Sequence, residues 1–507
     1  MKRILCALLA LLMLLSLAAC GTGDSGKSTE SESATQSEET ETEANVDTSL
    51  VCDLPSNLNY KDDEVTIIYA KASGREDELV SEGLGNGTVS DAVYERNQLV
   101  ESQLHVKLNL IGEDGANVAT KVKTDISTSN GTPEYDLVSN GTYVAITPAI
   151  EGQYKNLSVL DNIDTSKSYW TQGYNNLTTF TSEKRQYLAS GPIAISMFRL
   201  MFLTIYNRTV MENNKMEDLY DVVMRGDWTL DYQYSLISGM YVDLSGDSKR
   251  TDDDAYGFIT GNIVSVDPYM VSGGVALITK DPETMELTFN SDAQAQLTEL
   301  VDAVQKLLQD SGTYMYSGSD MDDVGKSNIV DTFGKGNSLM ATLMFWNMET
   351  NIDQLSALSY GIAPIPKYST TQEYRSYVQD QVSSFGISAG VRGEDRTEEL
   401  AAVLESMAYH SYNVVRPAYY TNTLSTRYMQ DPQSEQILNL IFKSLYFDFS
   451  QTCSNILTGS CLRDLMRPIM SGKKNTVSSQ MRSWNRSIPK RLTKINDSLD
   501  KLGETEE

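Results

Sequence analysis

The stretch DLSGDSKRTDDDAYGF, residues 243–258, places oxygen-bearing side chains at the spacing of a metal-binding loop. A calcium loop needs hard oxygen ligands at positions 1, 3, 5, 9 and 12 and a backbone carbonyl at position 7. Counted from the first aspartate, the positions 1, 3, 5, 7, 9 and 12 are held by Asp243, Ser245, Asp247, Lys249, Thr251 and Asp254. The spacing therefore predicts a bound calcium ion.

Three features of this stretch depart from a standard calcium loop. Ser245 stands where an acidic residue is usual, Ser248 replaces the turn glycine, and Asp254 replaces the bidentate glutamate. A plain acidic turn capped by Asp243 is therefore the alternative. No general base or nucleophile lies beside the loop in the sequence, so we expect any calcium here to be structural and expect no catalytic cofactor.

Other sequence patterns that could support catalysis are weak. The chain has 2 histidines, His105 and His410, and neither has a serine or cysteine constellation near it. Catalysis by histidine and histidine-ligated zinc therefore lack the necessary residues. The stretch GTGDSGKS, residues 21–28, fits the phosphate-loop pattern, but no strand precedes it and no helix follows it, so we interpret the match as chance.

The N-terminus predicts secretion. Lys2 and Arg3 precede an apolar run that is shorter than the ~20 residues a membrane span needs, so residues 1–19 are expected to be a cleaved signal peptide. The letters LAAC before and at Cys20 resemble a bacterial lipobox, which implies lipidation of Cys20 and anchoring to the extracellular face of the membrane. An ordinary secreted protein is the alternative. Residues 20–58 are expected to be a tether, because their Ser/Thr/Glu-rich part has no apolar pattern.

The net charge limits the classes of partner, and the cysteines limit the possible disulfides. The formal net charge of -28 argues against nucleic acid, whose binders need basic surface. Cys52, Cys453 and Cys461 remain outside the membrane, and the last two are close enough in sequence to form a local disulfide. A bond from Cys52 to one of them is the alternative.

The first part of the mature chain alternates strand and helix patterns. The runs EVTIIYA, VKLNLIG and YDLVSNG read as strands, with helical patterns at 90–105 and 117–129 between them. This order predicts a parallel sheet with right-handed crossovers. Ligands of such sheets bind at the carboxyl ends of the strands, where the candidates are Tyr69, Asn140 and Tyr143.

Later segments mix strands and helices and end in a helical tail. The basic stretch of this tail, residues 482–494, is interpreted as a solvated helix face. Several further stretches stand in a characteristic order: GDWTLD (226–231), DLSGDSKRTDDDAYGF, NSLMATLMFWN (337–347), YGIAPIPK (360–367) and FGISAG (385–390). Together with the lipobox, the tether and the opening pattern, this order resembles the extracellular solute-binding proteins of bacterial ABC importers, in the family 1 type that takes sugars and oligosaccharides.

The resemblance implies an α/β, two-lobed periplasmic-binding-protein-like fold with a hinge and a central ligand cleft. Carried over, it places the first part of lobe 1 at residues 59–143, lobe 2 at 144–381 and the return to lobe 1 at 382–445. The C-terminal helices at 446–507 remain unassigned between the lobes.

Further site residues follow from the resemblance. Trp346 ends the stretch LMFW, where the family stacks an aromatic ring on sugar. Trp170 lies near the expected first crossing between lobes, and Tyr269 in DPYMVSGG is similar to an aromatic-then-glycine stretch of the maltose-type proteins. Asp136 in the third strand is a candidate partner of ligand hydroxyls. Packing in the core, or a turn cap for Asp136, is the alternative in each case.

Three functions compete on this basis. A carbohydrate-binding component of an importer would close over its ligand, deliver it to ABC permease subunits and break no bond. A protein of the same fold could bind another solute, such as a peptide or an anionic metabolite. A surface glycosidase would need two carboxylates at a defined separation, and no recognisable catalytic strand motif carries them.

Overall fold

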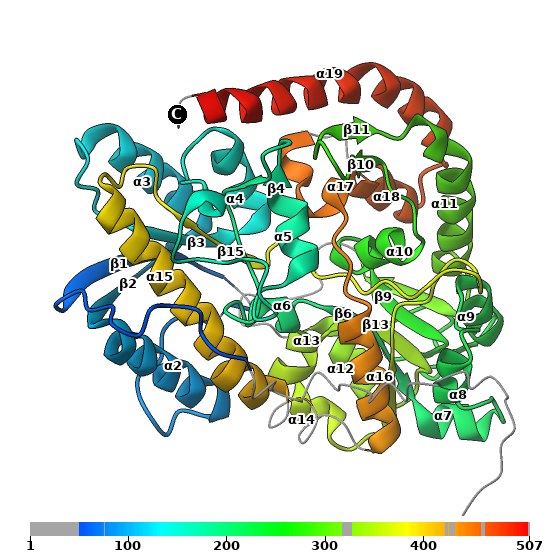
Figure 1. Cartoon of the computed structure of the whole chain (residues 1–507). Coiled ribbons are helices and arrows are strands. Elements are labelled where there is room, and N and C mark those ends of the chain that lie inside the picture. Colours follow the sequence, from blue (N-terminus) through cyan, green and yellow to red (C-terminus); the bar gives the residue numbers. More distant parts are fainter. Residues whose placement is uncertain are drawn as a thin grey trace, which may run out of the picture. The chain divides into compact units, whose positions relative to one another are not determined.

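Two β-sheets organise the chain, and helices cover them (Figure 1). The computed structural model describes residues 50–72, 74–75, 77–316, 327–420, 424, 431–457 and 462–504. All of them lie in the compact unit Thr42–Glu507. The mixture of helices and sheets confirms the predicted α/β class.

The first sheet has the strand order β15-β3-β1-β2. Strands β1 (Asp63–Lys71), β2 (Val106–Asp114) and β3 (Leu137–Gly141) run parallel, as the sequence predicts. Strand β15 (Ser383–Ile387) comes from much later in the chain and pairs antiparallel with β3. The centre of β1 is fully buried, which explains its continuous apolar run.

Four helices cover this sheet. Helices α2 (Thr88–Leu104) and α15 (Glu394–His410) pack together on one face, and α3 (Gly115–Thr128) and α4 (Thr142–Ile150) pack together on the other (Figure 1). His105 ends α2 in the left-handed conformation, with φ 53°, and its amide N–H donates to the carbonyl of Glu101. This histidine therefore has a local structural role.

The second sheet has the order β12-β9-β13-β6-β14. Its strands β9 (Phe258–Gly261), β12 (Thr313–Tyr316) and β13 (Met340–Met344) run parallel, and β6 (Phe202–Asn207) is antiparallel to both β13 and β14 (Tyr360–Ala363). Every residue of β6, β9, β13 and β14 is buried. Helices α8 (Leu219–Met224), α11 (Gln294–Leu308), α12 (Asn328–Gly334) and α16 (Pro432–Lys443) contact it.

The crossings between the sheets differ from the predicted boundaries. The chain was expected to leave the first lobe near Val144, but α4 packs on β3 and α3, and Ala189 still bridges Phe385 of β15. The chain from α4 to Ala189 therefore still packs on the first sheet, and it crosses to the second sheet just before β6. The return was expected to extend to residue 445, yet α16 contacts β14 of the second sheet.

The remaining elements are mostly short and connect or cap the two sheets. They are η1 (Leu157–Val159), α5 (Gln172–Thr178), β4 (Thr179–Phe180), β5 (Arg185–Gln186), α6 (Ser196–Arg199), α7 (Arg208–Asn213), α9 (Leu230–Ile237), β7 (Tyr241–Val242), β8 (Ala255–Tyr256), η2 (Val264–Val266), α10 (Asp267–Ser272), β10 (Ile278–Lys280), β11 (Leu287–Phe289), η3 (Ser291–Ala293), α13 (Phe345–Thr350), α14 (Ile352–Leu355), η4 (Ser411–Val415), α17 (Phe449–Thr452), η6 (Ser454–Leu457) and α18 (Leu462–Met470).

The last helix, α19 (Val477–Glu504), runs along the outside of both groups of elements (Figure 1). It contacts α11 and β11 beside the second sheet and α4 beside the first. Leu502 near its end is so close to Gly152 that a Cβ there would lie 2.5 Å from the leucine Cδ2. The unassigned C-terminal helices therefore do not belong to one sheet alone.

Candidate ligand-binding site

The carboxyl edge of the first sheet brings together three of the predicted residues. Tyr69 of β1 pairs in register with Ser139, the neighbour of Asn140 on β3, and Tyr143 is the second residue of the helix that follows β3. The Asn140 amide is committed to the chain itself: it accepts from the Gly141 N–H at 2.8 Å and donates to the Gly115 carbonyl at 2.9 Å. Tyr69 and Tyr143 are half-buried and keep exposed ring surface.

Trp346 occupies the matching edge of the second sheet, directly after β13. The loop after β1 approaches it closely: a Cβ on Gly74 would lie 2.5 Å from Leu200 Cδ2 and 3.8 Å from Trp346 Cγ. Gly74 also has φ +78°, which favours glycine. The strand ends of the two sheets therefore meet here, and the contact leaves only 4% of Trp346 exposed.

A cluster of two buried ion pairs lies beside this contact. The Arg463 guanidinium of α18 pairs with the Asp380 carboxylate and lies 4.5 Å from the ring centre of Tyr143, whose N–H donates to the Asp380 carbonyl at 2.9 Å. One helical turn further on, Arg467 binds the Asp267 carboxylate through two N–H groups, at 2.6 and 3.1 Å. The cluster joins α4, α10, α18 and the segment before β15.

Burial sets the electrostatics of this cluster. The side chains of Asp267 and Asp380 are 2% and 3% exposed, whereas those of Arg467 and Arg463 are 29% and 14% exposed. Desolvation raises the pKa of Asp267 to about 6, although Arg467 opposes the shift, and it raises the pKa of Asp380 too. The two positive and two negative charges balance, so the cluster adds little net charge to the strand-end contact.

A third buried carboxylate, that of Glu78, fixes the loop that carries Gly74. Glu78 accepts from the N–H and Oγ of Ser196, at 3.0 and 2.7 Å, and from the Ser383 hydroxyl at the start of β15. Its own carbonyl accepts from the guanidinium of Arg96 at 3.1 Å. Burial raises the pKa of Glu78. The post-β1 loop is thus bonded to both chain segments that cross between the sheets.

Asp136 lies at the opposite end of the first sheet from Asn140. It precedes β3, where its carboxylate accepts from the Thr66 N–H at 2.9 Å and pairs with Arg396 at 2.8 Å. These contacts match the structural alternative, a residue that caps and joins chain segments. The structure therefore does not bring Asp136 together with Tyr69, Asn140 and Tyr143.

Trp170 and Tyr269 lie in the core instead of at the strand ends. Trp170 is 2% exposed, and its indole N–H donates to Glu405 of α15 at 2.9 Å. Tyr269 is 0% exposed, and its hydroxyl bonds to that of Thr342 on β13 at 3.1 Å. What separates both residues from Trp346, which is also almost fully buried, is therefore their place away from the strand-end contact.

The acidic loop closes on its own backbone. The Asp254 carboxylate accepts from the N–H groups of Leu244 and Thr251, both at 3.0 Å, and Asp243 accepts from those of Gly246 and Ser248 at 2.6 and 2.8 Å. Among the residues the structure describes, no group of three or more His, Cys, Asp or Glu side chains could hold a metal ion. Calcium at this loop stays a prediction.

Several N-terminal and cysteine predictions fall where the structure gives no description. The signal peptide at 1–19, Cys20 and most of the tether at 20–58 lie outside the described residues, and so does Cys461. Cys453 is a free, buried thiol, so the structure does not form the predicted bridge from it. Within the described part, no helix has both the length and the apolar character needed to cross a membrane.

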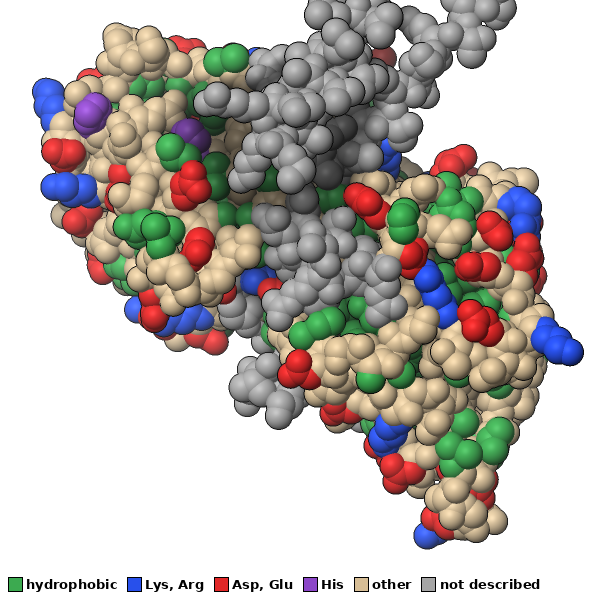
Figure 2. All heavy atoms as spheres, turned by 90° about the horizontal axis from the view of Figure 1, so that it is seen from below, with side chains coloured by type: hydrophobic (Ala, Val, Ile, Leu, Met, Phe, Trp, Pro, Cys, Tyr) green, Lys and Arg blue, Asp and Glu red, His purple; other side chains and the backbone are tan. Residues whose placement is uncertain are grey.

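The arginine and aspartate cluster was missed in the sequence. Its partners stand 83 and 200 positions apart, so no local pattern connects them. The one available signal is the spacing of Arg463 and Arg467, which places both on one side of a helix. On the face of the molecule seen in Figure 2, by contrast, acidic and basic side chains are interspersed.

Solved structures of other proteins share the fold of this chain. A scan against protein families finds no match, and a search of curated proteins finds no relative. Among solved structures, the GacH receptor of Streptomyces glaucescens, solved unliganded and with acarbose, has a TM-score of 0.52 and 13% identity over 85% of this chain and 99% of its own. A cyclo/maltodextrin-binding protein complexed with maltotetraose has a TM-score of 0.52 and 12% identity, over 86% of this chain and 97% of its own.

UspC of M. tuberculosis has a TM-score of 0.51 and 12% identity, over 84% of this chain and all (100%) of its own. At this level of identity the likeness concerns the fold, and it extends over most of the chain. The chain therefore shares the α/β fold of these structures.

Proposed function

We propose that this chain is the cell-surface substrate-binding lipoprotein of an ABC transporter. It binds a carbohydrate, of oligosaccharide length, by closure of its two lobes and delivers it to permease subunits without making or breaking a bond. The signal peptide and the lipid on Cys20 hold it at the extracellular face of the membrane.

The observation that carries the proposal is the meeting of the strand ends around Gly74 and Trp346. In open α/β sheets, ligands bind outside the carboxyl ends of the strands. Here these edges of two sheets face each other, and the aromatic rings of Trp346, Tyr143 and Tyr69 lie along them. Such rings suit the flat apolar faces of sugars. Two proteins of the same fold are named for complexes with acarbose and maltotetraose.

Charge balance favours a neutral ligand over an anionic one. Arg463 and Arg467 are the cations of the adjacent cluster, and each is already paired with a buried aspartate. An anionic solute would have to compete with Asp380 or Asp267 for them. The same pairing supports a role without catalysis, because both carboxylates are held by arginines instead of facing a substrate.

A thermal-shift screen of the purified mature chain against neutral oligosaccharides tests this proposal. Ligand that binds only the folded state stabilises it, by about 2.7 kcal/mol at a concentration 100-fold above Kd, and so raises the melting temperature. Acarbose and maltotetraose belong in the panel, beside dipeptides and phosphorylated metabolites. A selective rise with a glycan is expected. A rise with peptides or phosphates alone overturns the carbohydrate assignment.

Two variants, one at the strand-end contact and one in the core, test whether ligand binds at the contact. Trp346→Ala is expected to weaken the glycan's affinity by at least about tenfold, about 1.4 kcal/mol, because it removes the ring that opening of the lobes would expose to ligand. Tyr269→Phe serves as the control, since its ring is buried and the substitution removes only the hydrogen bonds of its hydroxyl, to Thr342 and Gln233. Equal loss in both variants would mean that stability, and not a binding contact, had been measured.

A further inference from the structure

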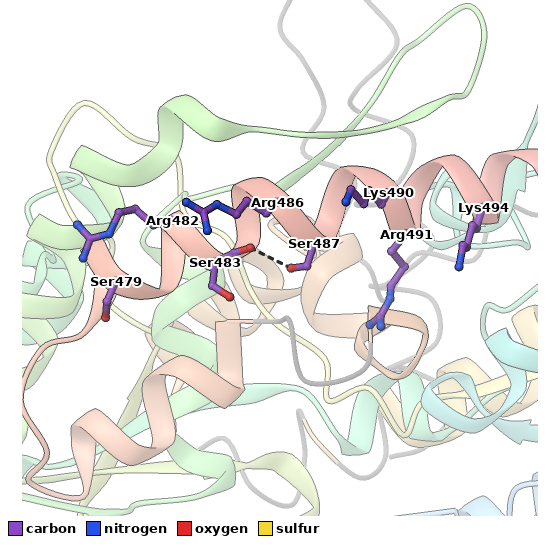
Figure 3. A pocket seen from close by; sticks show the side chains of 8 residues that line it. All are labelled: Ser479, Arg482, Ser483, Arg486, Ser487, Lys490, Arg491 and Lys494. Carbon is purple, nitrogen blue, oxygen red and sulfur yellow. Dashed lines mark hydrogen bonds between the residues drawn. The ribbon is translucent and has the colours of Figure 1, made fainter.

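The exposed side of α19 carries an unusual concentration of positive charge. Figure 3 shows the row Arg482, Arg486 and Lys490, which recurs every fourth residue, beside a row of serines. Together the lining residues surround a shallow depression of about 690 Å³. We call this surface the cationic face; its residues are Ser479, Arg482, Ser483, Arg486, Ser487, Lys490, Arg491 and Lys494.

The opposite side of α19 fixes which way this surface points. A stripe of apolar side chains is buried against the neighbouring elements and holds the helix in one rotation about its axis. These residues are Val477, Met481, Trp484, Ile488, Leu492, Ile495 and Leu499. The cationic face is therefore held outward along about 18 Å of helix, from Arg482 to Lys494 at 1.5 Å per residue. This rigid presentation goes beyond a loosely solvated basic tail.

The positive charge of this surface is not neutralised within the described residues. Arg491 donates to the Leu457 carbonyl, but no ion pair in the described part of the chain involves the other four cations. The helix carries no acidic residue before Asp497. In a chain of net charge -28, a run of five cations without an acid is a local reversal of sign. Charges beyond the Debye length of about 8 Å at physiological salt do little to cancel it.

We propose that the cationic face docks on an anionic lipid surface and so orients the body of the protein on the membrane. This proposal rests on the lipid anchor of the proposed function, which would keep the body near such a surface. Arginine and lysine groups bind headgroup phosphates by charge-assisted hydrogen bonds. The short serines leave room between the cations for a phosphate to approach, and their hydroxyls can donate to it.

The direct test is vesicle co-sedimentation of the full mature chain with Cys20→Ser, so that no acyl chain contributes. Vesicles of equal parts phosphatidylglycerol and phosphatidylcholine are expected to bind it at low salt and release it at high salt, while pure phosphatidylcholine vesicles do not bind it. Each basic residue near an anionic surface contributes about a fivefold factor in affinity. The variant Arg482→Gln/Arg486→Gln/Lys490→Gln/Lys494→Gln is therefore expected to lose at least about tenfold.

The matched control removes the same charge elsewhere: Lys61→Gln/Lys107→Gln/Lys184→Gln/Lys215→Gln, four exposed lysines. It should bind the anionic vesicles as the parent does. Equal binding by both variants, or no binding by the parent, overturns the proposal. Soluble polyphosphate that binds the parent when vesicles do not would also overturn it, in favour of a polymeric anion.

The glycan melting shift, measured on the same preparations, separates the two proposals. It should persist in the four-site variant of α19, because the four substituted side chains are exposed and none belongs to the strand-end contact. Loss of every glycan shift together with intact vesicle binding would overturn the proposed ligand and leave the docking surface standing.

Discussion

Two sets of aspartates in this molecule are used in opposite ways. Asp243 and Asp254 of the acidic loop bond to backbone N–H groups within the same loop. Asp267 and Asp380 are almost fully buried and depend on arginines supplied by a distant helix, α18. The first set closes a local turn, whereas the second joins elements from both sheets next to the strand-end contact. Aspartate therefore stabilises a single turn in one region and holds together elements that are distant in sequence in the other.

The largest effect on stability is expected when one partner of a buried pair is removed. Asp380→Ala leaves Arg463 without its carboxylate, and such a loss typically costs about 3–5 kcal/mol. Urea unfolding of the variant is expected to show a free energy of unfolding lower by about that amount. In a double-mutant cycle with Arg463→Met, the two losses should be strongly non-additive. Additive losses would show that the pair contributes no coupling.

The titration of Asp267 should make the stability of the protein depend on pH. Burial raises the pKa of Asp267 to about 6, above its unfolded value. Its contribution to stability is therefore present below about pH 4 and lost as the pH rises through 6, a change of at most about 3 kcal/mol. Asp267→Asn should remove this fall from the pH profile of the free energy of unfolding. An unchanged slope in the variant would contradict the assignment.

The attachment of the acidic loop should have a smaller effect. The Arg250 guanidinium stacks over Tyr241 and Tyr256, at 4.8 and 5.2 Å, and donates to the carbonyls of Ser311 and Thr313. Arg250→Ala is expected to cost about 1–2 kcal/mol and to expose the loop to protease. Arg250→Lys, which keeps the charge and loses the planar fork, should recover only part of this. Full recovery would mean that charge alone holds the loop.

The smallest effect is expected within the loop itself. The Thr251 N–H helps to lower the pKa of Asp254, so the contribution of this group is present above its usual pKa and lost as the pH falls, opposite in sign to that of Asp267. If calcium binds as the spacing predicts, chelator lowers the melting temperature slightly and added calcium restores it. An unchanged melting temperature in chelator would support the alternative, a plain acidic turn whose carboxylates are satisfied by backbone amides.

Local patterns and distant contacts explain which predictions hold. The alternation of strand and helix patterns correctly predicts β1, α2, β2, α3 and β3, because the signal for each element lies within its own sequence. The placement of Tyr69, Asn140 and Tyr143 on one edge follows from that alternation. Whether Trp170 and Tyr269 are exposed depends on helices far away in sequence, and so does the pairing of α18 with Asp267 and Asp380. No local pattern carries that information.

The central claim is that the meeting of two strand edges around Trp346 binds a neutral glycan and leaves it unchanged. The most direct measurement is isothermal titration calorimetry of the mature chain with the glycan that gives the largest melting shift, followed by mass spectrometry of the recovered ligand. We expect one saturable site, a large loss of affinity in Trp346→Ala, and a recovered glycan of unaltered mass. Heat without saturation, undiminished affinity in the variant, or cleaved glycan would contradict it.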